Sequence, residues 1–437
     1  MARNVLLSFL GRNDYEYCFY TYRGQRSSYT RFVQTAIYEL FRSEEPMDVI
    51  IFATKEAKES NWNDKIRDGQ QVEGIKTAFQ RIAPEATVKL VEIESGQDES
   101  ANWKLFDSII AEIGEGDTIY FDITHSFRSI PFVALIVLNY ARLVKKATIG
   151  ALAYGWFEKL GRPNEVKQLS PEQRLVPIVD LTNMAELLDW TNGVDQFLRT
   201  GDASLIKELT ARENRKVFCD ANASPLLKKE VAELNKLAKQ LDQTGKSIRT
   251  CRSLQVEEEV EKFRYQLEQV RHSQAEAIKP LVPILDEMEK KYSNFGGNTI
   301  INGWEVARWC VDNGLIQSAL TMLSENVVTA ICRAFQLKVT NVEIRNDLHS
   351  TIRIIIRRTK KEEWEVHSDP FVEEMVEKLL PYRELLKPFG EVAELRNDMN
   401  HAGVRERPLT ADRFAQRVKT LLDAIKPFFE EMAVLSQ

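Results

Sequence analysis

Residues 117–128 constrain the fold most, because they join a short apolar run to a polar cluster and then to an apolar helix. Residues 118–123 are apolar and β-branched, which is typical of a buried strand. Residues 130–138 are apolar on all sides, with Pro131 in the first turn of the expected helix, where its missing N–H costs nothing. The polar cluster therefore lies between the carboxyl end of a strand and the amino end of a helix.

This position predicts a ligand site. Ligands of open α/β sheets bind outside the carboxyl ends of the strands, and the free N–H groups of a helix amino end favour an anion. Thr124, Ser126 and Arg128 can hydrogen-bond a phosphate there. The alternative is that Thr124 and Ser126 cap the helix and Arg128 pairs with a nearby acid.

Strands alternate with helices over about the first 180 residues, which predicts a mostly parallel sheet with right-handed crossovers. A second polar turn, Gly11-Arg12-Asn13-Asp14, follows the first strand. No Gly-x-Gly-x-x-Gly loop occurs, which argues against a dinucleotide cofactor. The expected strands are residues 5–10, 48–53, 88–93, 118–123, 147–154 and 176–181, with a hairpin arm at 17–22 that turns at Gly24 and helices from about Ser28, at 75–82 and at 103–113.

The remaining chain shows mainly helical periodicity. Residues 293–303 hold three glycines and predict a flexible joint. Residues 351–358 look β-like and basic; they predict either a hairpin touching RNA phosphates or a sheet edge protected by charge. The expected helices are residues 184–198, 225–241, 254–290, 315–336, 371–380, 391–401 and 410–435.

Composition narrows the class of protein. The net charge of −6 excludes a general polycation, so any nucleic-acid contact must be local. Five scattered cysteines favour a reducing cytoplasm over a disulfide framework or a zinc site. No signal peptide opens the sequence, and the apolar helix is too short to span a bilayer, so we expect a cytoplasmic protein without a membrane segment.

A second cluster of polar residues, Arg396, Asn397 and His401, lies near the carboxyl end. Asn397 and His401 share a helix face, and all three converge if the helix unwinds at residues 402–403. Histidine moves protons near neutral pH and arginine stabilises a phosphorane, so the trio suits metal-independent RNA cleavage. One histidine cannot serve easily as both base and acid, and a twofold dimer would supply a pair. A polar helix end is the structural alternative, and residues 345–349 form a partial decoy of the same motif.

Residues 122–128 together with Arg396-x-x-x-x-His401 resemble the CARF–HEPN ribonucleases of type III CRISPR systems. Residues 8–11, the Tyr-rich hairpin and residues 31–34 also resemble that family, so the likeness extends over almost the whole chain. The resemblance implies a fold class of α/β plus all-α. Residues 1–182 would form a Rossmann-like CARF domain, 183–295 a helical linker region and 296–437 a helical HEPN domain.

The resemblance also implies a function. A cyclic oligoadenylate, tetra- or hexa-adenylate, would bind the CARF domains of a homodimer or higher homo-oligomer, and the HEPN domains would then cut single-stranded RNA to leave a 2′,3′-cyclic phosphate, without a metal or other cofactor. Arg396, Asn397 and His401 would form the nuclease site. The alternative is a non-catalytic cyclic oligoadenylate sensor that acts through a partner or nucleic acid. The residues expected to contact the messenger are Gly11, Arg12, Asn13, Thr124, His125, Ser126 and Arg128.

Overall fold

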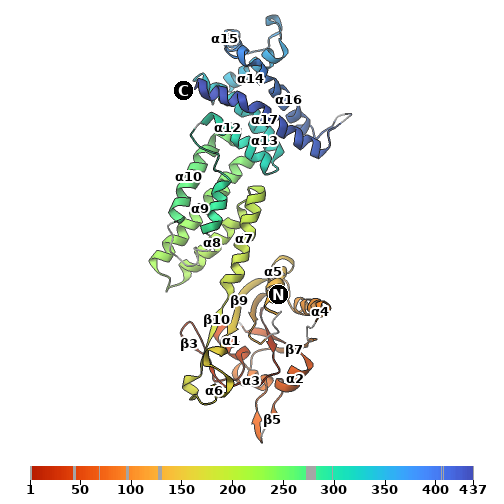
Figure 1. The fold of residues 1–437 in the computed structure, drawn as a ribbon, viewed down its shortest axis with the longest axis vertical. Coiled ribbons are helices and arrows are strands. Elements are labelled where there is room, and N and C mark those ends of the chain that lie inside the picture. Colours follow the sequence, from red (N-terminus) through yellow and green to blue (C-terminus); the bar gives the residue numbers. More distant parts are fainter. Residues whose placement is uncertain are drawn as a thin grey trace. The chain divides into compact units, whose positions relative to one another are not determined.

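The computed structural model describes residues 2–42, 46–67, 69–94, 98–125, 130–271, 282–297, 299–404, 406 and 408–436. The chain divides into two compact units, Met1–Leu188 and Asp189–Gln437. The first is an α/β unit and the second is helical (Figure 1), which confirms the predicted order of an α/β part followed by an all-α part. The boundary lies within helix α7 (Thr182–Thr200), close to the predicted residue 182. The further division at residue 296 stays a prediction.

The first unit contains an eight-stranded sheet in the order β3-β2-β10-β9-β8-β1-β4-β7. Only the β2–β3 and β9–β10 pairs are antiparallel among its strand pairs in the described residues, so the predicted mostly parallel sheet is confirmed. The strands are β1 (Asn4–Leu10), β2 (Phe19–Tyr22), β3 (Gln25–Arg26), β4 (Met47–Ala53), β7 (Val88–Glu92), β8 (Thr118–Asp122), β9 (Thr148–Gly155) and β10 (Leu175–Asp180).

Both faces of this sheet are covered, which explains why its central strands are apolar without alternation. Along β1, Leu6 and Leu10 belong to a core with helices α1 (Val33–Phe41) and α3 (Ile75–Ile82). The intervening Val5, Leu7 and Phe9 belong to the opposite core, with α4 (Glu99–Ala111) and α5 (Ile130–Val144). Successive side chains of one strand therefore hold a helical layer on each side of the sheet.

Three features of this unit differ from the sequence expectations. Helix α1 begins at Val33 and not near Ser28, because Thr30 forms a backbone bridge with Cys18 and keeps the preceding residues extended. Helix α2 (Lys55–Asn61) and the small hairpin of β5 (Lys65–Arg67) and β6 (Gln70–Val72) were not predicted, since few of their residues are apolar. A short helix, α6 (Pro163–Val166), precedes β10.

The second unit packs around helix α13 (Ile316–Ala334), most of whose residues are buried. Its neighbours are α12 (Thr299–Asp312), α16 (Arg383–Asn400) and α17 (Ala411–Leu435). The sequence pattern predicted neither α8 (Ser204–Cys219) nor α12. Among the described residues, no helix is both long and apolar enough to cross a membrane. The helices after α7 are α8 (Ser204–Cys219), α9 (Pro225–Arg249), α10 (Ser253–Arg271), α11 (Val282–Lys290), α12 (Thr299–Asp312), α13 (Ile316–Ala334), α14 (Val342–Arg357), α15 (Asp369–Leu379), α16 (Arg383–Asn400) and α17 (Ala411–Leu435).

The β-like interpretation of residues 351–358 is wrong, because most of this segment lies in α14. Asn341 caps the helix, and its side-chain oxygen accepts hydrogen bonds from the N–H groups of Glu343 (2.9 Å) and Ile344 (3.2 Å). Leu348, Ile352 and Ile355 are buried and recur with helical spacing. The β-branched residues made this helical pattern resemble a strand. Burial of one face in the tertiary structure favours the helix over the local preference for a strand.

The predicted flexible joint at residues 293–303 is also wrong in part. Residues 299–303 form the first turns of α12. Gly303 lies against Asn326, whose side-chain nitrogen donates a 2.7 Å hydrogen bond to the Gly303 carbonyl. This glycine therefore serves the close packing of α12 and α13 and not a hinge.

Candidate functional site

Within the part of the chain that the structure describes, predicted site residues line a cavity in each unit. In the α/β unit, the parallel neighbours β1 and β8 bring their carboxyl ends together, so the Gly11 and Thr124 turns meet as expected. A cavity of about 200 Å³ opens there. Asn13, Thr124 and His125 line it. We call this space the sheet-edge cavity.

The protein itself holds the Thr124 hydroxyl. The hydroxyl donates to an Asp122 carboxylate oxygen (2.5 Å) and accepts from the Gly155 N–H (2.8 Å). Asp122 is fully buried, and this burial raises its pKa, although it also accepts a hydrogen bond from Ser8 (2.6 Å). Thr124 therefore fixes the turn at the end of β8. Both hydrogen bonds of its hydroxyl go to other residues of the chain, which suits a residue that positions the cavity wall.

The ring of His125 packs against that of Tyr15 in a tilted arrangement, with 4.3 Å between the ring centroids and an interplanar angle of 35°. Burial lowers the pKa of His125 to about 4, so the ring is neutral at pH 7. Its buried Nε2 atom has no hydrogen-bond partner among the described residues. The Tyr15 hydroxyl accepts a hydrogen bond from the Gly11 N–H (2.7 Å), and a Cβ atom at position 11 would lie 2.8 Å from that oxygen. The chain therefore approaches closely here because position 11 is glycine.

The sequence did not indicate Asn61, which supports this cavity from α2. Its side-chain nitrogen donates to the carbonyls of Gly11 and Asn13, each at 2.9 Å. Arg31 is 3 % exposed, lines the cavity and donates to the Asn61 side-chain oxygen (3.4 Å). The sequence pointed to Arg31 only through residues 31–34, which resemble the CARF–HEPN family. Nothing in the local pattern around Asn61 distinguishes it from other polar helix residues.

The remaining predicted contacts are not all at this cavity. Arg12 is exposed and is not among the described residues that line the cavity. Ser126 and Arg128 lie outside the described residues. Three acids also line the cavity, namely Asp14, Glu16 and Glu158.

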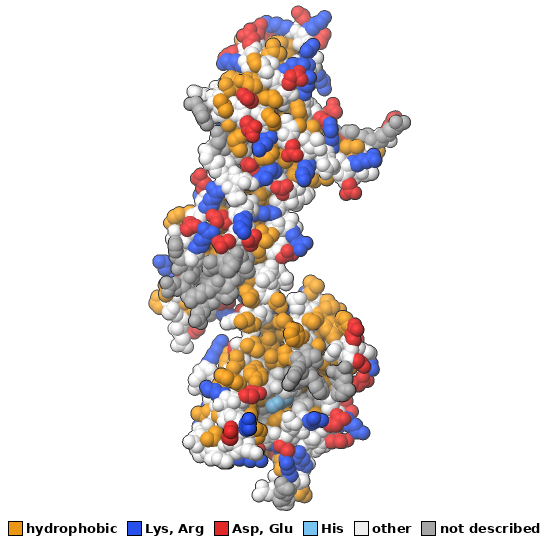
Figure 2. Space-filling view, in the orientation of Figure 1, with side chains coloured by type: hydrophobic (Ala, Val, Ile, Leu, Met, Phe, Trp, Pro, Cys, Tyr) orange, Lys and Arg blue, Asp and Glu red, His pale blue; other side chains and the backbone are white. Residues whose placement is uncertain are grey.

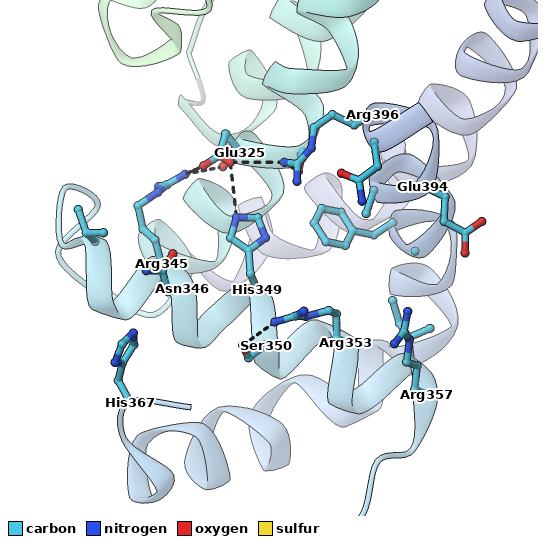
Figure 3. A pocket seen from close by; sticks show the side chains of 17 residues that line it. Glu325, Arg345, Asn346, His349, Ser350, Arg353, Arg357, His367, Glu394 and Arg396 are labelled. Atoms are coloured by element: carbon cyan, nitrogen blue, oxygen red, sulfur yellow. Dashed lines mark hydrogen bonds and ion pairs between the residues drawn. The ribbon is translucent and has the colours of Figure 1, made fainter. Parts of the chain in front are cut away.

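The second cavity, of about 990 Å³, lies between helices α13, α14 and α16 and contains Arg396 and Asn397 (Figure 3). We call it the helical pocket. Glu325 of α13 is at its centre, 2.7 Å from Arg345, 3.6 Å from His349 and 3.8 Å from Arg396. The contacts with His349 and Arg345 outweigh burial and lower the pKa of Glu325 to about 2, so this carboxylate is ionised at neutral pH.

Arg396 is held in place on the wall of the helical pocket. Its Nη1 atom donates to the Ser324 hydroxyl (2.9 Å), and its buried Nε atom has no partner among the described residues. A guanidinium group has five N–H donors, so Arg396 has others that can hydrogen-bond an incoming anion or a water molecule. Asn397, one residue further along α16, is exposed to the same pocket.

His401 is not brought together with Arg396 in this pocket. It is the carboxyl cap of α16 and is exposed, and its N–H donates to the Asn397 carbonyl (3.0 Å). The helix unwinds after it as predicted, because Ala402 and Gly403 have positive φ angles. The histidines that line the pocket are His349 and His367.

The supposed decoy, residues 345–349, therefore belongs to the same pocket as Arg396. Arg345, His349, Arg353 and Arg357 are spaced by four residues, so they lie along one face of α14, and all four line the pocket. Figure 3 shows Arg345, His349 and Arg396 directed at Glu325 from different sides. Their helical spacing is readable in the sequence once residues 342–357 are known to be a helix.

A hydrophobic surface covers one side of α5. Phe132 is 75 % exposed and Leu143 is 72 % exposed, and Ile136 and Tyr140 lie between them at helical spacing. Figure 2 shows hydrophobic side chains gathered over this part of the α/β unit. We refer to these four residues as the α5 apolar row.

No group of three or more His, Cys, Asp and Glu side chains that could hold a metal ion forms among the described residues. The predicted metal-independent chemistry is not tested by that finding and stays a prediction.

Comparison with known proteins links the chain to CRISPR-associated proteins. The family described as CRISPR-associated protein MJ1674, second domain, matches residues 186–299. The CRISPR-associated protein MJ1674 of Methanocaldococcus jannaschii is 25 % identical over 257 residues, which cover 56 % of this chain and 34 % of that protein. The chain thus spans about a third of the length of this relative, to which it is related over part of its own sequence.

Proposed function

We propose that this chain is a CRISPR-associated endoribonuclease that a cyclic oligoadenylate activates. The α/β unit is the CARF domain in this proposal, and the sheet-edge cavity binds the activator. The helical unit contains the HEPN domain, which cuts single-stranded RNA. The relationship to a CRISPR-associated protein and the order of an α/β unit before a helical one support the assignment.

The observation that carries the nuclease assignment is the position of Arg396 and Asn397 on the wall of a large pocket with several cationic side chains. Such a pocket suits a phosphodiester, because guanidinium groups bind phosphate oxygens in a fixed geometry. The 2′-hydroxyl of the RNA attacks the adjacent phosphorus, and Arg396 stabilises the charge that develops on the phosphorane oxygens. Asn397 orients the phosphate, and His401 transfers a proton.

The proposal includes a homodimer. The α5 apolar row presents large hydrophobic side chains to solvent, and a surface of this kind commonly marks a protein interface. We assign a second copy of the chain to it, because a cyclic activator with internal symmetry is matched by two copies of one site about a twofold axis. His401 lies at an exposed helix end, so it is open to contact with another subunit.

The test is cleavage of a fluorescent single-stranded RNA by purified protein in the presence of a chelator. Cyclic tri-, tetra- and hexa-adenylate are compared as activators. Cleavage with one ring, a 2′,3′-cyclic phosphate product and loss of cleavage in His401→Ala with unchanged ring binding are expected. Retained cleavage by His401→Ala would remove that residue from the site.

The second candidate is a cyclic oligoadenylate sensor without catalytic activity. The exposed position of His401, outside the helical pocket, favours it. In that case the cations of the pocket bind a partner or nucleic acid. The purified protein would bind a ring and never cut RNA.

A further inference from the structure

The carboxyl-terminal motif offers one histidine for two proton transfers. Cleavage by a 2′-hydroxyl requires a base for that hydroxyl and an acid for the departing O5′ atom. The helical pocket contains a histidine that this motif does not include. His349 lies on α14, and with Arg396 it approaches the same carboxylate.

His349 and Arg396 approach the Glu325 carboxylate at a single oxygen atom. The same oxygen of Glu325, Oε1, lies 3.6 Å from Nε2 of His349 and 3.8 Å from Nη1 of Arg396. The imidazole and the guanidinium thus approach one oxygen, so both side chains lie close enough together to act on one phosphodiester. Glu325 is 42 % exposed at its side chain, so an RNA phosphate can reach this set of groups from solvent.

The ring of His349 is held in a defined orientation. It packs against Phe389 of α16, with 6.0 Å between centroids and an interplanar angle of 27°. Its Nε2 faces Glu325, which its neighbours keep ionised. A carboxylate placed at one ring nitrogen fixes the tautomer and leaves the other nitrogen to accept a proton. Here the accepting atom is Nδ1.

We propose that His349 is a catalytic residue of the nuclease site, namely the general base, and that Glu325 is its positioning residue. This inference rests on the proposed ribonuclease function. Nδ1 of His349 takes the proton of the 2′-hydroxyl as the O2′–P bond forms. The P–O5′ bond breaks, and O5′ takes a proton from His401. The products are a 2′,3′-cyclic phosphate and a 5′-hydroxyl, so no co-reactant is required.

The position of the other cations agrees with this role. Arg353 and Arg357 continue the face of α14 beyond His349 and line the same pocket. They are placed to hold phosphates on one side of the scissile bond. Helix α14 thus supplies both the base and a part of the RNA path in this proposal.

The first test compares His349→Ala with a control outside the pocket, Arg417→Ala on α17, whose side chain is paired with Glu391. Cleavage is measured in chelator at saturating activator. We expect kcat to fall about 10²–10⁴-fold in His349→Ala, with KM for RNA changed less than about threefold. Arg417→Ala should stay within about threefold of the unmodified protein. A kcat of His349→Ala within threefold of the unmodified protein would overturn the proposal.

The second test separates the base from the acid. RNA with sulfur in place of the bridging O5′ has a leaving group that needs no protonation. This substrate should restore cleavage to His401→Ala and not to His349→Ala. Restoration in His349→Ala would show that His349 is not the base.

The third test addresses folding. If His349→Ala does not fold, His349→Gln and Glu325→Gln replace it, since both keep side-chain volume and hydrogen bonding. Glu325→Gln should lower kcat about tenfold and alter the acidic limb of the pH–rate profile with unchanged KM. A normal profile in both variants would exclude the assigned roles. Unmodified protein that never cuts RNA would refute the ribonuclease function itself, whereas cutting that is indifferent to position 349 would refute this inference alone.

Discussion

The sheet-edge cavity and the helical pocket are built in different ways. In the α/β unit, backbone groups dominate. Asn61 binds two carbonyls, Gly155 donates its N–H to Thr124, and Gly11 donates to Tyr15. In the helical pocket, side chains dominate, and an ionised Glu325 holds Arg345 and His349.

This difference explains what each region is suited to do. A cavity fixed by backbone hydrogen bonds is preorganised, so it can bind a ligand without a large ordering cost. A pocket that gathers cationic side chains from different helices can offer several donors to one substrate phosphate. The histidines of the two cavities, His125 and His349, differ in a similar way. His125 is neutral through burial, whereas His349 faces an anion.

The largest expected effect lies in the helical pocket. Arg396→Ala should lower RNA cleavage about 10²–10³-fold, because it removes a donor to the developing phosphorane. Activator affinity should be unchanged. Single-turnover cleavage and ring binding measure the two quantities. Arg417→Ala on α17 is the control, since Arg417 is paired with Glu391 and does not line the pocket. Equal losses in both variants would mean that unit stability, and not the site, was affected.

The next effect sharpens the contrast between the histidines. The folded protein lowers the pKa of His125 from 6.5 to about 4, so the unfolded chain binds the proton more tightly. The contribution to stability is complete above about pH 6.5 and is lost as the pH falls towards 4, by at most about 3 kcal/mol. His125→Asn should remove this decline.

The decline in stability is measured by urea unfolding at pH 7, 5 and 4. Hydrogen exchange of the β1 and β8 amides serves as the probe of unfolding. His401→Asn, a substitution at an exposed helix end, is the control. An unaltered decline in His125→Asn would assign it to other groups.

A smaller effect is expected from Asn61→Ala, which removes the donor to the Gly11 and Asn13 carbonyls. The free energy of unfolding of the α/β unit should fall by about 1–3 kcal/mol, and activator affinity should fall with it. RNA cleavage at saturating activator should remain close to normal. Asn222→Ala, at an exposed turn, is the matched control. Unchanged activator affinity would show that activator binding does not depend on the hydrogen bonds from Asn61 to the Gly11 turn.

The smallest effect should follow from Arg353→Ala, which removes one exposed cation of α14. RNA affinity should fall only a few-fold, and the slope of log affinity against log salt should decrease by about 0.7, as for one lost phosphate contact to single-stranded nucleic acid. Fluorescence anisotropy in 50–200 mM salt measures it. Arg215→Ala on α8, also exposed, should leave the slope unchanged. A slope that is equal in both would place the RNA elsewhere.

Local pattern was sufficient for much of the fold. The apolar runs that became β1, β4 and β8 predicted strands buried on both faces, and the turns after β1 and β8 were placed correctly at one edge of the sheet. The end of α16 was also predicted, because glycine at position 403 tolerates the positive φ angle that stops a helix. These features depend on residues close together in sequence.

The sequence by itself thus determined the order of an α/β part before a helical part, the edge of the sheet that carries the cavity, and Arg396 and Asn397 as candidates. Only the tertiary structure decided that residues 351–357 are helical, that Asn61 fixes the Gly11 turn, and that Glu325 joins Arg345, His349 and Arg396. The physical reason is that periodicity reports which face of an element is buried. It does not report which other element covers that face, and contacts between side chains on α13, α14 and α16 depend on that packing.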